Sequence, residues 1–378
     1  MKKQWEQTQG IYIHIPFCMQ KCLYCDFASF ANKSGLMHQY ALAMVEEIRR
    51  RAGEMPISER ATVFFGGGTP SLLPIDDLKM IINALEEMEL WREPAEVTME
   101  MNPGTVDFAK LCQYREIGID RVSFGVQSLN DKELKTIGRL HTAREALQAI
   151  EQASKAGFKR ISADLIYGLP LQTLATFKDT LATIVASAIS HLSVYGLTVE
   201  EGTPLAAMLA KGSLMLPSEE EAERMYDHTI SYLEEHGLHR YEISNFARTG
   251  QESQHNLIYW HYLPYYGFGS SACSYNGKQR MTNAADVESY IRGAAPTIEQ
   301  LSARTSLAEF MFLGLRKTEG INLSVAKERF GVDIMAMFGQ EIEKYINKEM
   351  LSFDQAENTL KLTKLGMKFG NEIFELFL

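Results

Sequence analysis

Short β-rich runs alternate six times with helical patterns in the first half of the sequence, and this alternation constrains the fold more than any other feature. The predicted strands span residues 10–15, 62–65, 96–101, 121–126, 160–167 and 191–195. The predicted helices span residues 36–52, 76–89, 107–117, 131–137, 143–156 and 174–188. Consecutive βα units predict a parallel sheet with helices on its outer side. Since a closed barrel of this kind needs eight units, we predict an α/β fold with an open, partial (β/α)6 barrel, whose chemistry lies on the loops after the strands.

The alternation of strands and helices ends at about residue 205, and we predict that the chain divides into three parts. Residues 1–205 form the partial barrel, residues 206–295 an extension, and residues 296–378 a C-terminal module. In the extension we expect a helix over 217–237, an edge strand over 240–246 and an irregular, aromatic-rich stretch over 252–276. The module has helical patterns at 305–315, 323–330 and 337–347, a strand pair near 350–362 and a last helix to residue 378, which together are typical of a winged-helix-like α+β unit.

The composition excludes a disordered chain, a collagen and a disulfide-stabilised scaffold. Hydrophobic residues make up 46% and charged residues 23% of the chain, an ordinary globular balance. The formal net charge of −10 disfavours nucleic acid as the main partner, since a phosphate backbone needs a positive surface. The uncharged stretch 180–199 carries many polar residues, and we interpret it as a buried helix that runs into a strand rather than a membrane span. With no signal peptide evident, we expect a cytoplasmic protein without an integral membrane segment.

Three of the five cysteines crowd together directly after the first predicted strand, in the spacing Cys18-x3-Cys22-x2-Cys25. Three thiolates on one loop can hold three irons of a 4Fe–4S cluster, which leaves the fourth iron open to a substrate or cofactor. A zinc site is the alternative, but structural zinc prefers four ligands, often as two spaced pairs, and a fourth ligand is not obvious in the sequence. The spacing therefore indicates an iron–sulfur cluster on a βα loop.

The cysteine spacing, with the aromatic Tyr24 before the last cysteine, resembles that of the radical S-adenosylmethionine (SAM) superfamily. The resemblance implies that SAM chelates the open iron. It also implies that an electron from the reduced cluster, delivered by an electron donor, cleaves SAM to methionine and a 5′-deoxyadenosyl radical. In such systems the cofactor carries the chemistry, and the protein positions and shields it.

Further residues follow the predicted strands in the order of the same superfamily pattern. A glycine-rich run from Gly66 to Thr69 follows the second strand, and glycine lets a backbone approach a ligand closely. Acidic and amide side chains lie in or at the ends of the third, fourth and fifth strands, where side chains meet ligands in barrel-like folds. The SAM-binding residues expected from the resemblance are Tyr12, Tyr24, Gly67, Gly68, Thr69, Glu100, Gln127, Arg139, Asp164 and Thr198.

Three longer phrases are similar to the oxygen-independent coproporphyrinogen III oxidase group of this superfamily. They begin at Tyr12, Phe65 and Asp164 and read YIHIPFC, FGGGTPS and DLIYGLP. The group has two main branches, the decarboxylating oxidases and the HemW-type haem chaperones. The oxidases carry a further cysteine two positions after the third, where this sequence has Phe27, and a longer segment before the cluster loop. These differences favour the chaperone branch.

A six-residue segment carries the mark of the chaperone branch, H-N-x-x-Y-W. It reads HNLIYW, and from it we expect His255, Asn256, Tyr259 and Trp260 to contact haem, which assigns residues 206–295 to porphyrin or haem. Imidazole ligates haem iron, and flat aromatic rings pack against a flat macrocycle. The iron ligand stays open at this point, because His261 is adjacent and tyrosine also ligates iron in some haem proteins. A structural histidine in an aromatic core is the alternative to haem contact.

We therefore predict a haem chaperone that keeps a 4Fe–4S cluster and SAM and hands haem to haem-requiring acceptor proteins, with respiratory enzymes among the candidates. The alternative is a coproporphyrinogen III oxidase that forms protoporphyrinogen IX. A third reading is a radical enzyme with another substrate. Contact with a membrane, if the acceptor is a respiratory complex, would be peripheral. The C-terminal module is expected to cover the open side of the barrel or to offer a partner surface.

Overall fold

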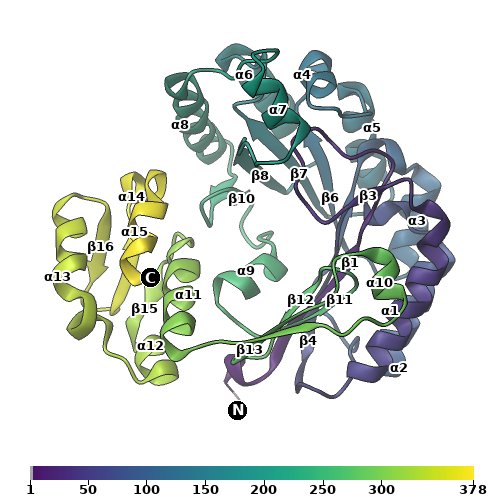
Figure 1. The fold of residues 1–378 in the computed structure, drawn as a ribbon. Helices are drawn as coiled ribbons and strands as arrows, with labels where there is room; N and C mark the ends of the chain where they lie inside the picture. Colours follow the sequence, from purple (N-terminus) through teal and green to yellow (C-terminus); the bar gives the residue numbers. More distant parts are fainter. Residues whose placement is uncertain (1–2) are drawn as a thin grey trace.

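The computed structural model describes residues 3–378, and one twelve-stranded sheet forms its centre. Six parallel strands run side by side in chain order: β1 (Thr8–Ile15), β4 (Ile57–Gly67), β5 (Val97–Met101), β6 (Arg121–Gln127), β7 (Arg160–Tyr167) and β8 (His191–Gly196). The sheet curves around without closing (Figure 1). The α/β fold and the open partial barrel predicted from the six βα units are confirmed.

Helices follow the strands and cover the outer face of the sheet. The predicted ones are α1 (Met37–Arg51), α2 (Ile75–Glu87), α3 (Phe108–Glu116), α4 (Asp131–Thr136), α5 (Ala143–Lys155) and α6 (Leu174–Val185). Two of them, α4 and α5, follow β6. β8 is followed by α7 (Pro204–Ala210), which the sequence analysis missed, and by the predicted amphipathic helix α8 (Glu219–Glu235). Within residues 3–378, no helix has the length and apolar character needed to cross a membrane.

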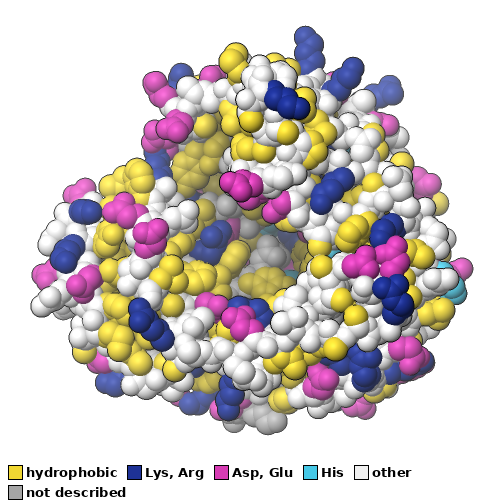
Figure 2. Space-filling model, viewed as in Figure 1, with side chains coloured by type: hydrophobic (Ala, Val, Ile, Leu, Met, Phe, Trp, Pro, Cys, Tyr) yellow, Lys and Arg dark blue, Asp and Glu magenta, His cyan; other side chains and the backbone are white. Residues whose placement is uncertain are grey.

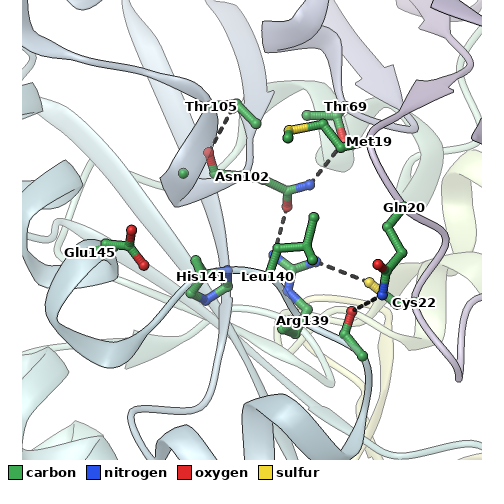
Figure 3. Close-up of a pocket in the computed structure, with 12 residues that line it drawn as sticks. Met19, Gln20, Cys22, Thr69, Asn102, Thr105, Arg139, Leu140, His141 and Glu145 are labelled. Carbon is green, nitrogen blue, oxygen red and sulfur yellow. Dashed lines mark hydrogen bonds between the residues drawn. The ribbon is translucent and has the colours of Figure 1, made fainter.

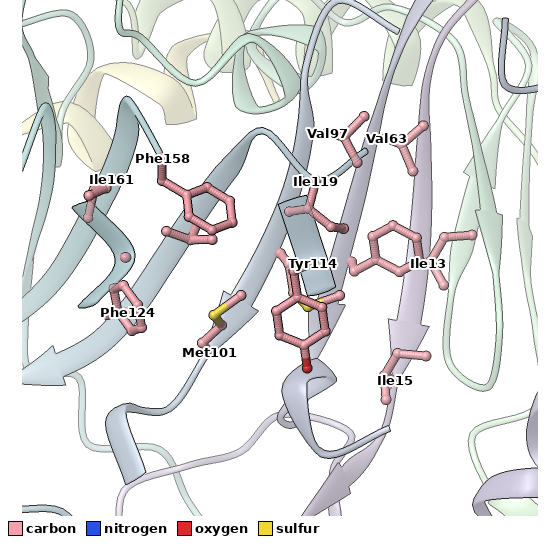
Figure 4. Packing of buried hydrophobic residues seen from close by; sticks show 14 of the residues in the cluster. Ile13, Ile15, Val63, Val97, Met101, Tyr114, Ile119, Phe124, Phe158 and Ile161 are labelled. Carbon is pink, nitrogen blue, oxygen red and sulfur yellow. The ribbon is translucent and has the colours of Figure 1, made fainter. Parts of the chain in front are cut away.

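Apolar side chains fill the space between the sheet and the outer helices. α5 illustrates how the sequence achieves this: Thr142 and Glu145 form a capping box at its start, and its buried residues recur at three- and four-residue spacing from Ala146 to Ala153. Figure 4 shows strand residues of this core, such as Met101 and Phe124, beside residues of the helical layer. The packed outer layer leaves the loops at the C-terminal strand ends to build the site.

The edge strand predicted over 240–246 is wrong as a single element. The chain forms two short strands, β9 (His239–Arg240) and β10 (Asn245–Ala247), and β10 pairs antiparallel with β8. The buried carboxylate of Glu242 lies in the turn between them. It accepts hydrogen bonds from the Ser244 amide at 2.7 Å and from Asn245 Nδ2 at 2.6 Å. These bonds satisfy backbone and side-chain donors in a turn, so the strand does not continue.

The aromatic-rich stretch 252–276 is regular, so the prediction of an irregular segment is wrong. It contains α9 (Gln254–Trp260), β11 (Tyr265–Phe268) and β12 (Cys273–Tyr275), and is followed by β13 (Gln279–Thr282), α10 (Val287–Ile291) and β14 (Thr297–Gln300). β11 pairs parallel with β1, and β12, β13 and β14 continue the sheet antiparallel. Such short strands leave little periodic pattern in a sequence, because the partner that stabilises β11 lies at the other end of the chain.

The C-terminal module has its own apolar core and a three-stranded sheet. Its elements are α11 (Ala303–Leu315), β15 (Ile321–Asn322), α12 (Leu323–Phe330), α13 (Ile334–Asn347), β16 (Leu351–Asp354), β17 (Thr359–Leu362), α14 (Lys364–Lys368) and α15 (Gly370–Phe374), with a final 3-10 turn. The three predicted helices and the strand pair are confirmed. The last predicted helix is broken, because Phe369 between α14 and α15 is not helical. The division of the chain at residues 205 and 295 stays a prediction, and the large sheet continues through β14 to Gln300.

The module lies beside the open side of the sheet (Figure 1). A cavity of about 700 Å³ separates it from α8, and Figure 2 shows the molecule hollowed between these two parts. Lys368 of the module forms ion pairs with Glu223 at 2.9 Å and Asp227 at 2.7 Å on α8. The module is therefore joined to the partial barrel across the hollow as well as through the chain.

Candidate functional site

The three cysteines lie on a loop that β2 (Phe17–Cys18) and β3 (Phe30–Ala31) close by pairing in parallel. This loop is fastened to the rest of the partial barrel. The Leu23 amide donates to the carbonyl of Ile137, at the end of α4, at 3.0 Å. The Cys25 amide donates to the Cys22 carbonyl at 3.2 Å within the loop. The thiols are therefore carried by a supported loop at the C-terminal end of β1.

A chain of hydrogen bonds connects two of the thiols through three other loops, and Figure 3 shows its part from Cys22 to Thr69. Arg139 Nη1 lies 3.4 Å from Cys22 Sγ, and Arg139 Nη2 donates to Asn102 Oδ1 at 2.7 Å. Asn102 Nδ2 donates to Thr69 Oγ1 at 2.9 Å, and Thr69 Oγ1 lies 3.7 Å from Cys18 Sγ. The sequence motifs predict every member of this chain as a site residue except Asn102. The sequence feature that could have indicated Asn102 is its position as a polar residue directly after the last residue of β5.

A cavity of about 200 Å³ adjoins this chain of bonds. Cys22, Thr69, Asn102 and Arg139 line it together with Met19, Gln20, Gly104, Thr105, Gly138, Leu140, His141 and Glu145. Arg139 is partly buried, and its buried Nε finds no hydrogen-bond partner among residues 3–378. A buried donor without a partner is costly, so it indicates that a further acceptor belongs here.

The glycine-rich run forms the end of β4 and the loop after it. Gly67 has a φ of +116°, a conformation that L-amino acids with side chains rarely adopt. A Cβ on Gly68 would lie 2.8 Å from the Phe17 carbonyl oxygen and 3.0 Å from Cys18 Sγ, so a side chain there would collide with the cysteine loop. The Gly67 amide donates to Glu100 Oε2 at 3.1 Å. Glycine is therefore needed at these positions to bring β4 against the cysteines.

Glu100 on β5 and Asp164 on β7, with β6 between them, are two carboxylates close enough for their charges to influence each other. Desolvation and the nearby charge of Asp164 raise the pKa of Glu100 to about 7. Burial likewise raises the pKa of Asp164, although Ser123 Oγ donates to its carboxylate at 3.2 Å. A ligand that donates hydrogen bonds to these carboxylates stabilises their ionised form. Such a ligand therefore lowers the raised pKa values again.

Tyr12 and His14 support the cysteine loop from β1. The Tyr12 hydroxyl lies 2.9 Å from His14 Nδ1, and His14 Nε2 lies 2.9 Å from the carbonyl oxygen of Ala28 on the loop. A carbonyl oxygen accepts only, so Nε2 carries the proton and the tyrosine hydroxyl donates to Nδ1. His14 belongs to the segment YIHIPFC at β1, but the sequence pattern alone predicts no role for it.

The remaining SAM-binding candidates differ in how close they lie to this centre. Gln127 ends β6 at a register shift with a φ of +66°, and its amide lies near Gly125 and Arg139. Tyr24 packs against a small apolar cluster that includes Ile137. Thr198 is exposed in the loop after β8. The structure thus brings Tyr12, Gly67, Gly68, Thr69, Glu100, Arg139 and Asp164 around the cysteine loop, with Thr198 at the periphery.

No group of three His, Cys, Asp or Glu side chains in the described part of the chain is arranged to hold a metal ion. The residues around the thiols nevertheless fit an iron–sulfur cluster. Thiolates are the usual ligands of iron–sulfur clusters, and the guanidinium of Arg139 lies 3.4 Å from Cys22 Sγ, within reach of a ligand of the cluster. The unpartnered Arg139 Nε and the adjacent cavity provide a donor and space for a carboxylate-bearing ligand.

The candidate haem segment forms α9, which Ser253 caps at its first turn. His255 is 1% exposed, and both of its ring nitrogens are engaged. Nδ1 shares a hydrogen bond of 2.7 Å with Thr62 Oγ1, and Nε2 shares one of 2.9 Å with the Tyr259 hydroxyl. Its ring stacks on Phe64 with centroids 5.0 Å apart, and desolvation lowers its pKa to about 4. As folded here, His255 is a neutral core histidine.

The other members of the segment point to different surroundings. Tyr259 lines a cavity of about 270 Å³ that Tyr262, Tyr265 and Tyr275 also line. Trp260 lines a separate cavity of about 360 Å³ at the junction with the C-terminal module, and the guanidinium of Arg316 lies 4.5 Å from its ring centroid. Asn256 is partly buried in the first turn of α9. The segment therefore links the partial barrel to the module.

The fold and the three-cysteine loop define a radical SAM protein. The family model described as Radical SAM superfamily matches residues 12–184, and the model described as HemN C-terminal domain matches residues 301–369. Among solved structures, coproporphyrinogen III oxidase (HemN) from Escherichia coli, a radical SAM enzyme, is similar with a TM-score of 0.83. The match covers 98% of this chain and 90% of that one at 22% sequence identity, which shows the shared fold alone.

Curated relatives show which family of the radical SAM superfamily the chain belongs to. Heme chaperone HemW of Bacillus subtilis is 36% identical over 377 residues, which cover 98% of this chain and 99% of that protein. Heme chaperone HemW of Lactococcus lactis is 34% identical over 378 residues, which cover 99% and 98%. The chain belongs to the HemW family of the radical SAM superfamily, as its motifs predicted. Membership of this superfamily implies a 4Fe–4S cluster and SAM.

Proposed function

We propose that this protein binds haem and passes it to haem-requiring acceptor proteins. The observation that carries the proposal is the His-Asn-x-x-Tyr-Trp segment, folded as α9 between the sheet and α11 of the C-terminal module. α9 presents Tyr259 and Trp260 to cavities on its two sides. Aromatic rings at a junction between two parts of a protein suit a flat macrocycle that must enter and leave. Full-length relatives named as heme chaperones support the same function.

Within this proposal Tyr259 and Trp260 contact the macrocycle, and His255 and Asn256 position them. Ligation of iron requires an imidazole nitrogen with a free lone pair. The two nitrogens of His255 are bonded to Thr62 and Tyr259, so His255 connects β4 to α9. This gives His255 a positioning role and leaves the ligand to another side chain.

The radical SAM site is the second part of the proposal. Cys18, Cys22 and Cys25 would hold the cluster, which when reduced supplies one electron to bound SAM. Arg139 would pair a carboxylate through Nε, and the carboxylates of Glu100 and Asp164 would accept hydrogen bonds from the ligand. The backbone at Gly67 and Gly68 permits close approach.

The remaining candidates complete the proposed SAM site. Tyr24 would line it from the cluster loop itself, and Tyr12, Thr69, Gln127 and Thr198 from other parts of the barrel. An electron-donor protein is the partner that reduction of the cluster requires. Respiratory enzymes are the acceptors we propose, since they need haem, and contact with a membrane would then be peripheral.

The exposed position of Phe27 supports a chaperone over an oxidase. Its side chain is 67% exposed, and it stands where the decarboxylating oxidases carry a further cysteine. The discriminating experiment is anaerobic incubation of the cluster-loaded protein with SAM, a reductant and coproporphyrinogen III. We expect no protoporphyrinogen IX. In a parallel assay, protein preloaded with haem should activate a haem-free acceptor enzyme faster than free haem at the same low concentration. Porphyrin product together with 5′-deoxyadenosine, and no gain in transfer, would replace the chaperone by an oxidase.

A further inference from the structure

The cavity beside Trp260 contains a histidine with one ring nitrogen available. His261 follows Trp260 directly and is the C-cap residue of α9. Its side chain is 40% exposed and lines the same 360 Å³ cavity. Nδ1 lies 3.0 Å from Lys317 Nζ, whereas Nε2 makes no hydrogen bond within residues 3–378 and has its nearest carboxylate oxygen, on Glu319, at 3.7 Å. Of the two histidines in this region, His261 has the nitrogen that a metal could reach.

The walls of the cavity supply both aromatic surface and cationic groups, which suit the flat ring and the propionates of haem. Trp5, Trp260 and Phe310 supply aromatic surface. Lys317 and Arg329 supply two cations on the module's side of the same cavity, and Glu319, which also lines it, forms an ion pair with Lys317 at 2.8 Å. Lys317 is 5% exposed, and Arg329 lies over the rings of Tyr262 and Phe310 with centroids at 4.9 and 5.9 Å. A ligand with a flat apolar ring and two carboxylates is complementary to such walls.

We propose that His261 ligates the haem iron through Nε2 in this cavity and that Lys317 and Arg329 bind the two propionates. The proposal rests on the haem-binding function above and assigns the ligand that the segment itself leaves open. The imidazole proton is accounted for in this step. A neutral imidazole of His261 that accepts from Lys317 at Nδ1 carries its proton on Nε2. When Nε2 binds iron that proton moves to Nδ1, which then ceases to accept from Lys317. The ammonium group also donates to Glu319 Oε1 at 2.8 Å, so the change at Nδ1 leaves one of its three N–H groups for a propionate.

This arrangement also accounts for release. The cavity is formed by the N-terminal segment, α9 and the C-terminal module together, because Trp5, His261 and Lys317 come from these three parts. A volume of about 360 Å³ is at the small end of ligand pockets, so one edge of the macrocycle stays exposed to an acceptor. A small displacement of the module would separate the propionate cations from the ligand.

The test uses the full-length, cluster-loaded protein and three probes: ferric haem, metal-free protoporphyrin IX and haem dimethyl ester. Absorption and magnetic circular dichroism report the iron ligand, and titration gives the dissociation constant. Loss of an outer partner of a metal ligand costs about 10–100-fold in affinity, so loss of the ligand in His261→Ala should weaken haem binding by at least about tenfold. It should abolish the histidine-ligated spectrum and leave affinity for metal-free protoporphyrin IX unchanged. His38→Ala, an exposed histidine on α1, is the matched control.

Lys317→Gln should weaken binding of haem but not of haem dimethyl ester, because the ester has no charged propionates. His261→Gln, with far-ultraviolet circular dichroism, replaces His261→Ala if that variant does not fold. A wild-type spectrum and affinity in a folded His261 variant would overturn the ligand assignment. An equal effect of Lys317→Gln on haem and its ester would overturn the propionate assignment. Failure of the unmodified protein to bind any of the three probes would instead remove the haem-binding function on which the inference rests.

Discussion

Arg139 Nη2 donates to Asn102 Oδ1 at 2.7 Å and so joins the turn after α4 to the loop after β5. Arg139 contacts the Cys22 thiol directly, and Asn102 bonds both to Arg139 and to Thr69, which lies beside the Cys18 thiol. The spacing of Cys22 from Cys18 is therefore set by side chains that come from other βα units. Such outer partners fix the orientation of the metal ligands, so they contribute to the affinity of the site as the ligands do.

Replacement of Asn102 by alanine should loosen the cluster without unfolding the protein. Arg139 and Thr69 would both lose a partner, and the predicted loss of cluster or SAM affinity is about 10–100-fold, the usual range for an outer partner of a metal site. Iron content after gel filtration and SAM binding by equilibrium dialysis measure the two affinities. Asn83→Ala, at an exposed position of α2, is the control. Equal iron retention in both variants would argue against a role for the Asn102 bridge.

Glu100 should make SAM binding depend on pH near neutrality. Its pKa is raised to about 7, and a ligand that donates to the carboxylate lowers that value again, so affinity should rise with pH up to about 7 and then level off. In Glu100→Gln the rise should be absent. Calorimetric titration of SAM between pH 5.5 and about 8 would follow the change. A wild-type affinity that stays flat over this range would mean that the carboxylate does not meet the ligand.

The same raised pKa has a consequence for stability without ligand. Because the folded protein holds the Glu100 proton more tightly than the unfolded chain, folding loses stability as pH rises from about 4.5 to about 7 and does not regain it above. The loss attributable to this group is at most about 3 kcal/mol. Glu100→Gln should remove it, so the variant should unfold at higher urea than the wild type at pH 8. Equal midpoints at pH 8 would contradict the raised pKa.

The sequence predicts the parts of this site that belong to local patterns. The cysteines, the glycine run and the acidic strand ends stand beside recognisable strands, and a parallel sheet brings its strand ends to one edge. Asn102 and His14 were missed as functional residues because their roles arise from contacts with loops distant in sequence, Arg139 and Ala28 respectively. The haem segment shows the opposite case. Its motif names His255, but the neighbours that occupy both ring nitrogens are visible only in the fold.

The fold beyond residue 240 was harder to predict for a related reason. β11 owes its place to β1, and Glu242 forms its turn through side-chain contacts. Neither interaction changes the hydrophobic periodicity on which strand prediction depends. The outer helices, by contrast, carry both their caps and their apolar stripes within a few residues, as α5 does from Thr142 onward.

His14→Phe should accelerate loss of the cluster. The variant keeps an aromatic ring but removes the bonds to Tyr12 and to the Ala28 carbonyl, so the loop that carries the cysteines loses its attachment to β1. We expect the rate of cluster release to a chelator to rise about tenfold, in line with other outer partners of metal sites. The decay of the cluster absorption at visible wavelengths measures it, with His38→Phe as control. An unchanged rate would show that the loop is held without His14.

Phe27→Cys should not create an oxidase. Since residue 27 is 67% exposed, the new thiol would lie in solvent rather than in the cavity beside Arg139. The variant should therefore react readily with a thiol reagent and still form no protoporphyrinogen IX from coproporphyrinogen III. Anaerobic turnover with product analysis by chromatography tests this. Appearance of porphyrin product in the variant alone would show that a single residue separates the two branches.

His255→Ala should act on stability before it acts on haem. The buried ring would be replaced by a cavity, and the hydroxyls of Thr62 and Tyr259 would each lose a partner. Truncation of a large buried side chain and loss of buried hydrogen bonds together cost about 3–5 kcal/mol, so the urea midpoint should fall markedly. His236→Ala, at an exposed position after α8, should leave the midpoint nearly unchanged. At temperatures where the His255 variant stays folded, its histidine-ligated haem spectrum should persist, because the iron is held by His261. A variant with wild-type stability that has lost this spectrum would make His255 the iron ligand and would require its side chain to leave the core.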